Sequence, residues 1–270
     1  MIGRLVGMLA AALAAIGGLA PAPAGAADVP VDLELVLAVD VSWSVDPTEA
    51  RLQRDGYIAA LRHPRVAAAI AAGPYQRIAL AYIEWAGTEH VTTVIDWRAV
   101  GSSVELEELA GVLTNAPIVR ARRTAPGAAI EVATAMILGN GFVGERMVID
   151  VSGDGIANAG PQVAVARDRA VEAGIVINGL PIVTMAPTRL YGGETVNLVN
   201  YYRECVIGGP GAFVVVADDF ANFAEAILKK LILEIAAAPP RNVSPRGLLW
   251  HAQATRGASP PPGLCDTVYW

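Results

Sequence analysis

Asp40, Ser42 and Ser44 occupy alternate positions directly after an apolar run that starts at Leu33. A buried strand rarely ends on one carboxylate and two hydroxyls unless something polar binds there. Carboxylate and hydroxyl oxygens are the ligands that hard divalent cations such as Mg²⁺ prefer. Taken alone, however, an Asp–Ser cluster after a strand more often caps the following helix.

Two other positions add oxygen ligands of the same kind. Thr124 opens a stretch with helical spacing that continues to Leu138, and Asp154 lies between two glycines after the apolar run 146–151. In an open α/β sheet, ligands bind outside the carboxyl ends of the strands. We therefore expect Asp40, Ser42, Ser44, Thr124 and Asp154 to form one cation site. Asp150 is a weaker candidate because it lies within the strand.

The elements that must position these residues alternate between strand-like and helical patterns. Strands are expected at 33–41, 78–85, 90–97, 146–151, 175–182 and 212–216, and helices at 48–61, 102–113, 124–138, 162–173 and 220–235. The short turn at 86–89 requires an antiparallel pair. The alternation predicts an α/β fold with a doubly wound, mostly parallel six-stranded sheet, one antiparallel edge strand and helices on both faces.

The three motifs together resemble the metal-ion-dependent adhesion site of the von Willebrand factor A domain. Asp40-x-Ser42-x-Ser44 matches the first element, the segment 124–130 matches Thr-x-x-Gly-x-Ala-Ile, and Asp154-Gly155 matches the third. The resemblance implies Mg²⁺, or Mn²⁺ or Ca²⁺, with the two serines as direct ligands. Asp40, Thr124 and Asp154 would bind directly or through water. The family's usual glycine is Trp43 here, which would narrow access or contact a partner.

A closer resemblance is visible in four sequence segments, at 52–57, 149–155, 177–180 and 206–213. They are similar to a bacterial family of exported A-domain-like proteins of unknown function. This resemblance implies the fold and supplies no biochemical role.

The composition limits the location and the partners. A basic start, an apolar run and a small-residue cleavage site predict a signal peptide over 1–26, with a membrane anchor as the alternative. An A-like domain over 31–237 and a Pro-rich tail over 238–270 would follow. We expect a periplasmic or secreted protein without a transmembrane anchor after cleavage. The net charge of −6, with no basic patch, argues against nucleic acid as a partner.

Cys205 and Cys265 are the only cysteines. In an oxidising compartment they predict one intrachain disulfide, and the alternative is two free thiols. The three histidines show no pairing and predict no zinc site. Glu84 is expected as an exposed charge at a hairpin edge, and residues 53–55 as a solvated helix face.

Three functions fit these observations. The first is a non-enzymatic, adhesion-type interaction module whose cation binds a carboxylate of a protein partner. The second is a metal-free structural protein of the cell envelope with the same fold. The third is a metal-dependent hydrolase with Asp40 as nucleophile, which is disfavoured because Ser42 stands where a phosphatase loop has a second Asp. The sequence contains no nucleophile elbow or phosphate-binding glycine loop. We therefore expect no enzyme activity.

Overall fold

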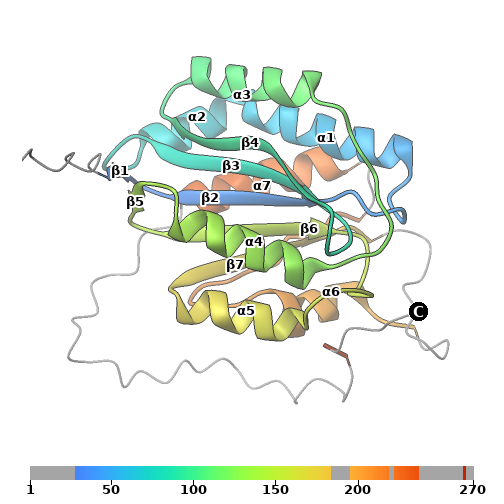
Figure 1. Cartoon of the computed structure of the whole chain (residues 1–270). Helices are drawn as coiled ribbons and strands as arrows, with labels where there is room; N and C mark the ends of the chain where they lie inside the picture. Colours follow the sequence, from blue (N-terminus) through green and yellow to red (C-terminus); the bar gives the residue numbers. More distant parts are fainter. Residues whose placement is uncertain (1–27, 184–194, 219–221, 237–263, 266–270) are drawn as a thin grey trace, which may run out of the picture.

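The computed structural model describes residues 28–183, 195–218, 222–236 and 264–265 (Figure 1). Its main sheet has five strands in the order β4-β3-β2-β6-β7. These are Val91–Val100, Ile78–Trp85, Glu34–Asp40, Met147–Gly153 and Ile175–Pro181. Only β3 and β4 pair antiparallel. The mostly parallel α/β sheet with an antiparallel edge strand is therefore confirmed.

Helices cover both faces of this sheet (Figure 1). One face carries α1 (Pro47–Leu61), α2 (Pro64–Ala71), α3 (Ser103–Asn115) and α7 (Phe223–Ala236). The other carries α4 (Pro126–Leu138), α5 (Val163–Glu172), the short α6 (Leu198–Tyr201) and a π-helical turn, Tyr202–Val206. Every residue of β2 is buried, which explains why its sequence is apolar without alternation.

Side chains of β2 divide between two cores. Leu35 and Leu37 pack with the α1 and α7 side, whereas Val36 and Ala38 pack with the α4 and α5 side. This is the two-residue period of a strand with a hydrophobic layer on each face. The parallel register then brings the ends of β2, β3 and β6 to one edge, with Asp40 opposite Trp85 and Val39 opposite Ser152.

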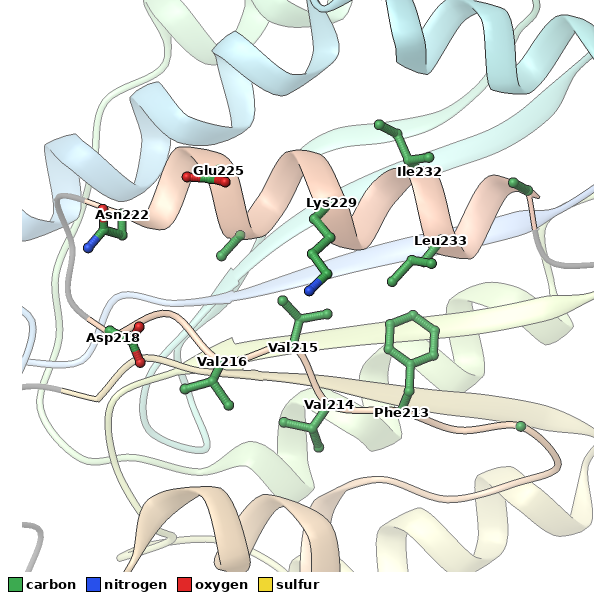
Figure 2. Close-up of a pocket in the computed structure, with 13 residues that line it drawn as sticks. Phe213, Val214, Val215, Val216, Asp218, Asn222, Glu225, Lys229, Ile232 and Leu233 are labelled. Atoms are coloured by element: carbon green, nitrogen blue, oxygen red, sulfur yellow. The ribbon is translucent and has the colours of Figure 1, made fainter.

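The structure corrects the prediction of a sixth strand, because the main sheet has five strands rather than six. The expected segment, 212–216, runs beside β7 but forms only an isolated pairing there, at Val214, and a second one follows at Ala217. Val215 N–H donates to the Gly179 carbonyl at 3.0 Å. Pro181 has no N–H to donate, so the ladder cannot continue regularly. A groove of about 1080 Å³ lies between this segment and α7 (Figure 2).

A second, two-stranded sheet joins β1 (Val29–Val31) to β5 (Phe142–Gly144). It had not been expected from the sequence, since both strands are only three residues long. None of the helices in the described residues has the length and apolarity to span a membrane. The predicted signal peptide and nearly all of the predicted tail fall outside the described residues.

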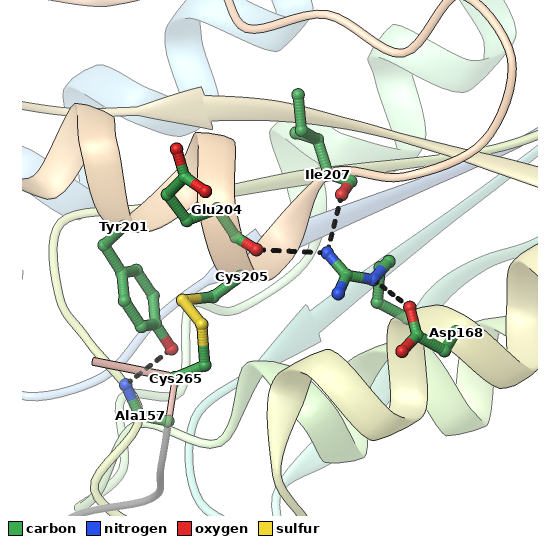
Figure 3. The surroundings of a disulfide bond; sticks show 8 residues. Ala157, Asp168, Tyr201, Glu204, Cys205, Ile207 and Cys265 are labelled. Carbon is green, nitrogen blue, oxygen red and sulfur yellow. Dashed lines mark hydrogen bonds and ion pairs between the residues drawn. A yellow bond between two sulfur atoms is a disulfide. The ribbon is translucent and has the colours of Figure 1, made fainter. Parts of the chain in front are cut away.

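Cys205 and Cys265 lie within disulfide distance, with Cα atoms 5.3 Å apart (Figure 3). Cys205 is in the π-helical turn and is fully buried. Arg167 of α5 donates to the carbonyls of Glu204 and Ile207, at 3.3 and 3.1 Å, at the end of the same turn. The turn is thus held from α5 and lies within disulfide distance of Cys265.

Candidate metal centre

Asp40 ends β2 with its side chain fully buried. Its Oδ1 accepts the Ser42 backbone N–H at 2.7 Å, and its backbone carbonyl accepts Nε2 of Gln53 at 2.8 Å. The second carboxylate oxygen, Oδ2, is buried and has no hydrogen-bond partner among the described residues. An oxygen of this kind is costly to bury unless a proton or a cation satisfies it.

The two serines connect Asp40's loop to Asp154. Ser42 Oγ lies 2.9 Å from Ser44 Oγ, and Ser44 Oγ donates to Oδ1 of Asp154 at 2.7 Å. The helix that follows is capped by a different residue, Asp46, whose Oδ1 accepts the N–H groups of Thr48 and Glu49. The alternative interpretation, that the cluster of Asp40, Ser42 and Ser44 caps this helix, is therefore wrong.

Thr124 lies beside the same loop. Its backbone N–H donates to Oδ1 of Asn158 at 2.7 Å, and Asn158 N–H donates to the Thr124 carbonyl at 2.9 Å. A Cβ built on Gly155 would be 3.7 Å from Thr124 Oγ1, so the hydroxyl lies next to the turn that carries Asp154. The fold thus gathers oxygen donors from three segments at the carboxyl edge of the sheet.

The electrostatics of this cluster are unfavourable without a positive charge. Burial, and secondly the charge of Asp154, hold the pKa of Asp40 well above its usual range. Burial also raises the pKa of Asp154 to about 6. The hydrogen bond from Ser44 lowers this pKa, and the negative charge of Glu49 raises it. The two carboxylates with neighbouring hydroxyls fit a hard cation. No group of three or more His, Cys, Asp or Glu residues suited to a metal occurs in the described part of the chain.

Trp43 does not fold over this cluster. Its side chain is 56 % exposed, and the guanidinium carbon of Arg122 lies 4.9 Å from its ring centroid. Arg120 Nη2 donates to the Trp43 carbonyl at 2.9 Å. The ring therefore stands at the surface, held by the segment that leads to Thr124.

Tyr202 lies next to the candidate site, although the sequence did not indicate this. A Cβ on Gly153 would lie 2.8 Å from Asp40 Oδ2 and 3.0 Å from the Tyr202 hydroxyl, which places both groups around the same glycine. Burial, and then the charge of Asp40, raise the pKa of Tyr202. Asn158 was also missed; nothing in its sequence context indicates that it would orient Thr124.

Two expectations about polar residues were wrong, apart from Asp55, which is exposed as expected. Gln53 and Arg54 are buried rather than solvated, and Glu84 is buried rather than exposed. Arg54 forms an ion pair with Glu84, and its Nη1 donates to the Leu113 carbonyl at 2.7 Å. These side chains fasten α1 to β3 and α3 because a buried charge must find a partner.

Asp150 is likewise a structural residue of the core. It forms an ion pair with Lys230 of α7, and Lys230 Nζ also donates to Glu234 Oε1 at 2.6 Å. All three side chains are buried in the layer between β6 and α7. Asp150 therefore lies outside the cluster around Asp40.

Comparisons with known proteins agree with this architecture. The family model described as "Protein of unknown function (DUF1194)" matches residues 30–239. No curated protein matches the sequence. Among solved structures, the chain is similar to proximal thread matrix protein 1 from the mussel byssus "with zinc occupied MIDAS motif", with 15 % identity and a TM-score of 0.53. The match covers 78 % of this chain and 47 % of the mussel chain.

A second similar structure is the pilus adhesin SpaC from Lactobacillus rhamnosus GG, with 13 % identity and a TM-score of 0.57. The match covers 76 % of this chain and 30 % of the adhesin chain, so this chain spans under half the length of both proteins. At such identities the likeness shows the fold alone. The chain belongs to the family described as protein of unknown function (DUF1194), and its fold is that of a von Willebrand factor A-like domain.

Proposed function

We propose that this protein is an exported, non-enzymatic interaction module that binds an acidic group of a protein partner through a divalent cation. Asp40, Ser42, Ser44, Thr124 and Asp154 hold the cation. The observation that carries the proposal is the buried Asp40 Oδ2, which has no partner among the described residues and lies beside Asp154's loop. A cation would satisfy this oxygen and offset the repulsion between the two carboxylates.

The donor set explains how such a cation would stay reactive toward a partner. Two carboxylates match the charge of Mg²⁺, and neutral hydroxyls complete part of its shell without adding negative charge. Mg²⁺ prefers six oxygens and commonly keeps several waters. When bound, the ion supplies a Lewis-acidic position that a partner's carboxylate can occupy. Asn158 and Gln53 serve this chemistry by fixing the backbones of Thr124 and Asp40.

Two further observations support the proposal. The similar mussel protein was solved with a zinc-occupied MIDAS motif, and SpaC is described as a pilus adhesin. The basic start, apolar run and cleavage pattern over residues 1–26 support export to the periplasm or beyond. Mg²⁺ is our first choice of cation, with Mn²⁺ and Ca²⁺ as alternatives.

Calorimetric titration of EDTA-stripped mature protein with Mg²⁺, Mn²⁺ and Ca²⁺ tests the proposal. We expect saturable binding of one ion per chain, and loss of that binding in Asp40→Asn. Asp55→Asn is the matched control, because Asp55 is an exposed carboxylate on α1. A wild-type protein that binds none of the three ions would contradict the proposal and favour a metal-free structural module.

A further inference from the structure

An arginine-rich segment borders the candidate metal centre. Arg120, Arg122 and Arg123 fall within four positions of a chain whose net charge is −6. Arg122 and Arg123 are exposed. None of the three arginines forms an ion pair with a carboxylate of the described residues. These cations lie beside one buried carboxylate, Asp40, and one half-buried carboxylate, Asp154, and no ion pair within the described residues accounts for them.

The segment is fixed in place relative to the cluster. Ala121 forms a parallel bridge with Ser42, and its N–H donates to the Val41 carbonyl at 3.2 Å. At its other end, Ala125 N–H donates to the Ala86 carbonyl at 2.7 Å. Arg123 has φ of 73°, a left-handed conformation that costs free energy in a non-glycine residue. The guanidinium groups therefore start from a backbone that is tied to the site on both sides.

Trp43 orients the central arginine. Its exposed ring lies beneath the Arg122 guanidinium, with 4.9 Å between the guanidinium carbon and the ring centroid. Arg120 donates to the carbonyl of the same tryptophan. A guanidinium stacked on an aromatic face keeps its edge N–H groups free to bind a carboxylate bidentately. Trp43 lies between the two serines of the cluster in sequence, so the stacked guanidinium is held on the loop that carries both serines.

We propose that the partner presents two carboxylates close together in sequence, one for the cation and one for Arg122, with Trp43 positioning the guanidinium. This inference rests on the proposed function and specifies its partner. Asp154 and Asp40 would be engaged by the cation, so they would not compete for the arginine. The binding surface is then the strip formed by Trp43, Arg122 and Arg123 beside the metal centre.

The test uses two synthetic peptides of equal length in saturating Mg²⁺. One contains Asp-Gly-Asp, and the other has the second Asp replaced by Asn. We expect the wild-type protein to bind the first peptide about tenfold more tightly, as suits one bidentate charge-assisted pair. Arg122→Gln should abolish this preference and leave binding of Mg²⁺ and of the single-carboxylate peptide intact. Arg122→Lys should retain only part of the preference.

Trp43→Gly tests the positioning role and should reduce the preference without affecting Mg²⁺ binding. Arg98→Gln, which removes an exposed arginine from β4, is the control and should behave as wild type. If the protein binds Mg²⁺ and binds both peptides with equal affinity, this inference is overturned and the proposed function stands. A preference that survives in Arg122→Gln also overturns it. Absence of Mg²⁺ binding overturns the proposed function and this inference with it.

Discussion

Ser44 Oγ donates a hydrogen bond of 2.7 Å to Asp154 Oδ1, joining the loop after β2 to the loop after β6 across 110 positions of the chain. β2 and β6 are neighbouring parallel strands, so their carboxyl ends open at the same edge of the sheet. The relationship shows how a short motif and a distant aspartate come to lie side by side at the candidate site. It also makes the site sensitive to small changes in either loop.

Gly153 and Gly155 provide a matched pair of substitutions on the two sides of Asp154. A Cβ at position 153 would lie 2.8 Å from Asp40 Oδ2, whereas one at position 155 would meet only Thr124, at 3.5 Å or more. We expect Gly153→Ala to displace the Asp40 carboxylate and weaken Mg²⁺ affinity at least tenfold. Gly155→Ala should weaken it far less. Calorimetry on both variants checks this, and equal affinities would contradict the packing around Gly153.

The titration of Asp154 predicts how stability depends on pH when EDTA keeps cations away. The pKa of about 6 in the folded protein exceeds the value of about 4 in an unfolded chain. The folded state therefore holds the extra proton, and its stability relative to the unfolded state falls as pH rises from about 4 through about 6. Asp154→Asn should flatten this part of the curve, which urea titrations at several pH values would reveal.

Added Mg²⁺ should reverse that trend. The ion needs deprotonated carboxylates, so the rise in melting temperature that it causes should grow as pH increases from about 5 to about 7. Asp55→Asn should keep this behaviour, because Asp55 is exposed and separate from the cluster. A Mg²⁺ effect that is the same at both ends of the range would contradict the assignment of Asp154 as a ligand.

The Arg54–Glu84 ion pair predicts a large cost for removing one partner. Arg54 is 2 % exposed and also donates to the carbonyls of Leu113 and Ala116. We expect Arg54→Leu to lower the free energy of unfolding by about 3–5 kcal/mol, since it leaves Glu84 buried without its cation. Arg62→Ala, at the C-terminal cap of the same helix, should cost far less, because its pair with Glu107 is exposed. Urea denaturation compares the two variants.

The proximity of Cys205 and Cys265 leads to a prediction for the oxidised protein. A bridge that closes 60 positions of chain restricts the unfolded state by up to about 4 kcal/mol. Cys205→Ser and Cys265→Ser should each lower the free energy of unfolding by a similar amount, up to that value. Urea denaturation measures this, and mass mapping under non-reducing conditions checks the pairing. Two free thiols in the mature protein would refute it.

The sequence by itself determined the five strands of the main sheet, most of the helices and the order of the motifs. The strands β2, β3, β6 and β7 could be recognised as apolar runs because helices cover them on both faces. The turn after Trp85 is so short that β4 can pair with β3 only in the antiparallel direction. The position of Asp40 at the end of a buried strand followed from the same pattern. These are local properties, fixed by side-chain periodicity and by the reach of a short turn.

The tertiary structure decided which polar residues share an environment. Arg54 looked solvated on α1 until the fold placed it against Glu84, and Asp150 met Lys230 only through the packing of α7 on β6. Tyr202 of the π-helical turn lies against Gly153, a contact that no pattern in the sequence indicated. Such pairings join residues that are far apart in the sequence. A buried charge needs a partner, but no local sequence pattern indicates which residue that partner is. The sequence thus places Asp40 next to two serines, and the fold adds the loop of Asp154 and the Tyr202 hydroxyl around them, because residues far apart in sequence meet only through packing.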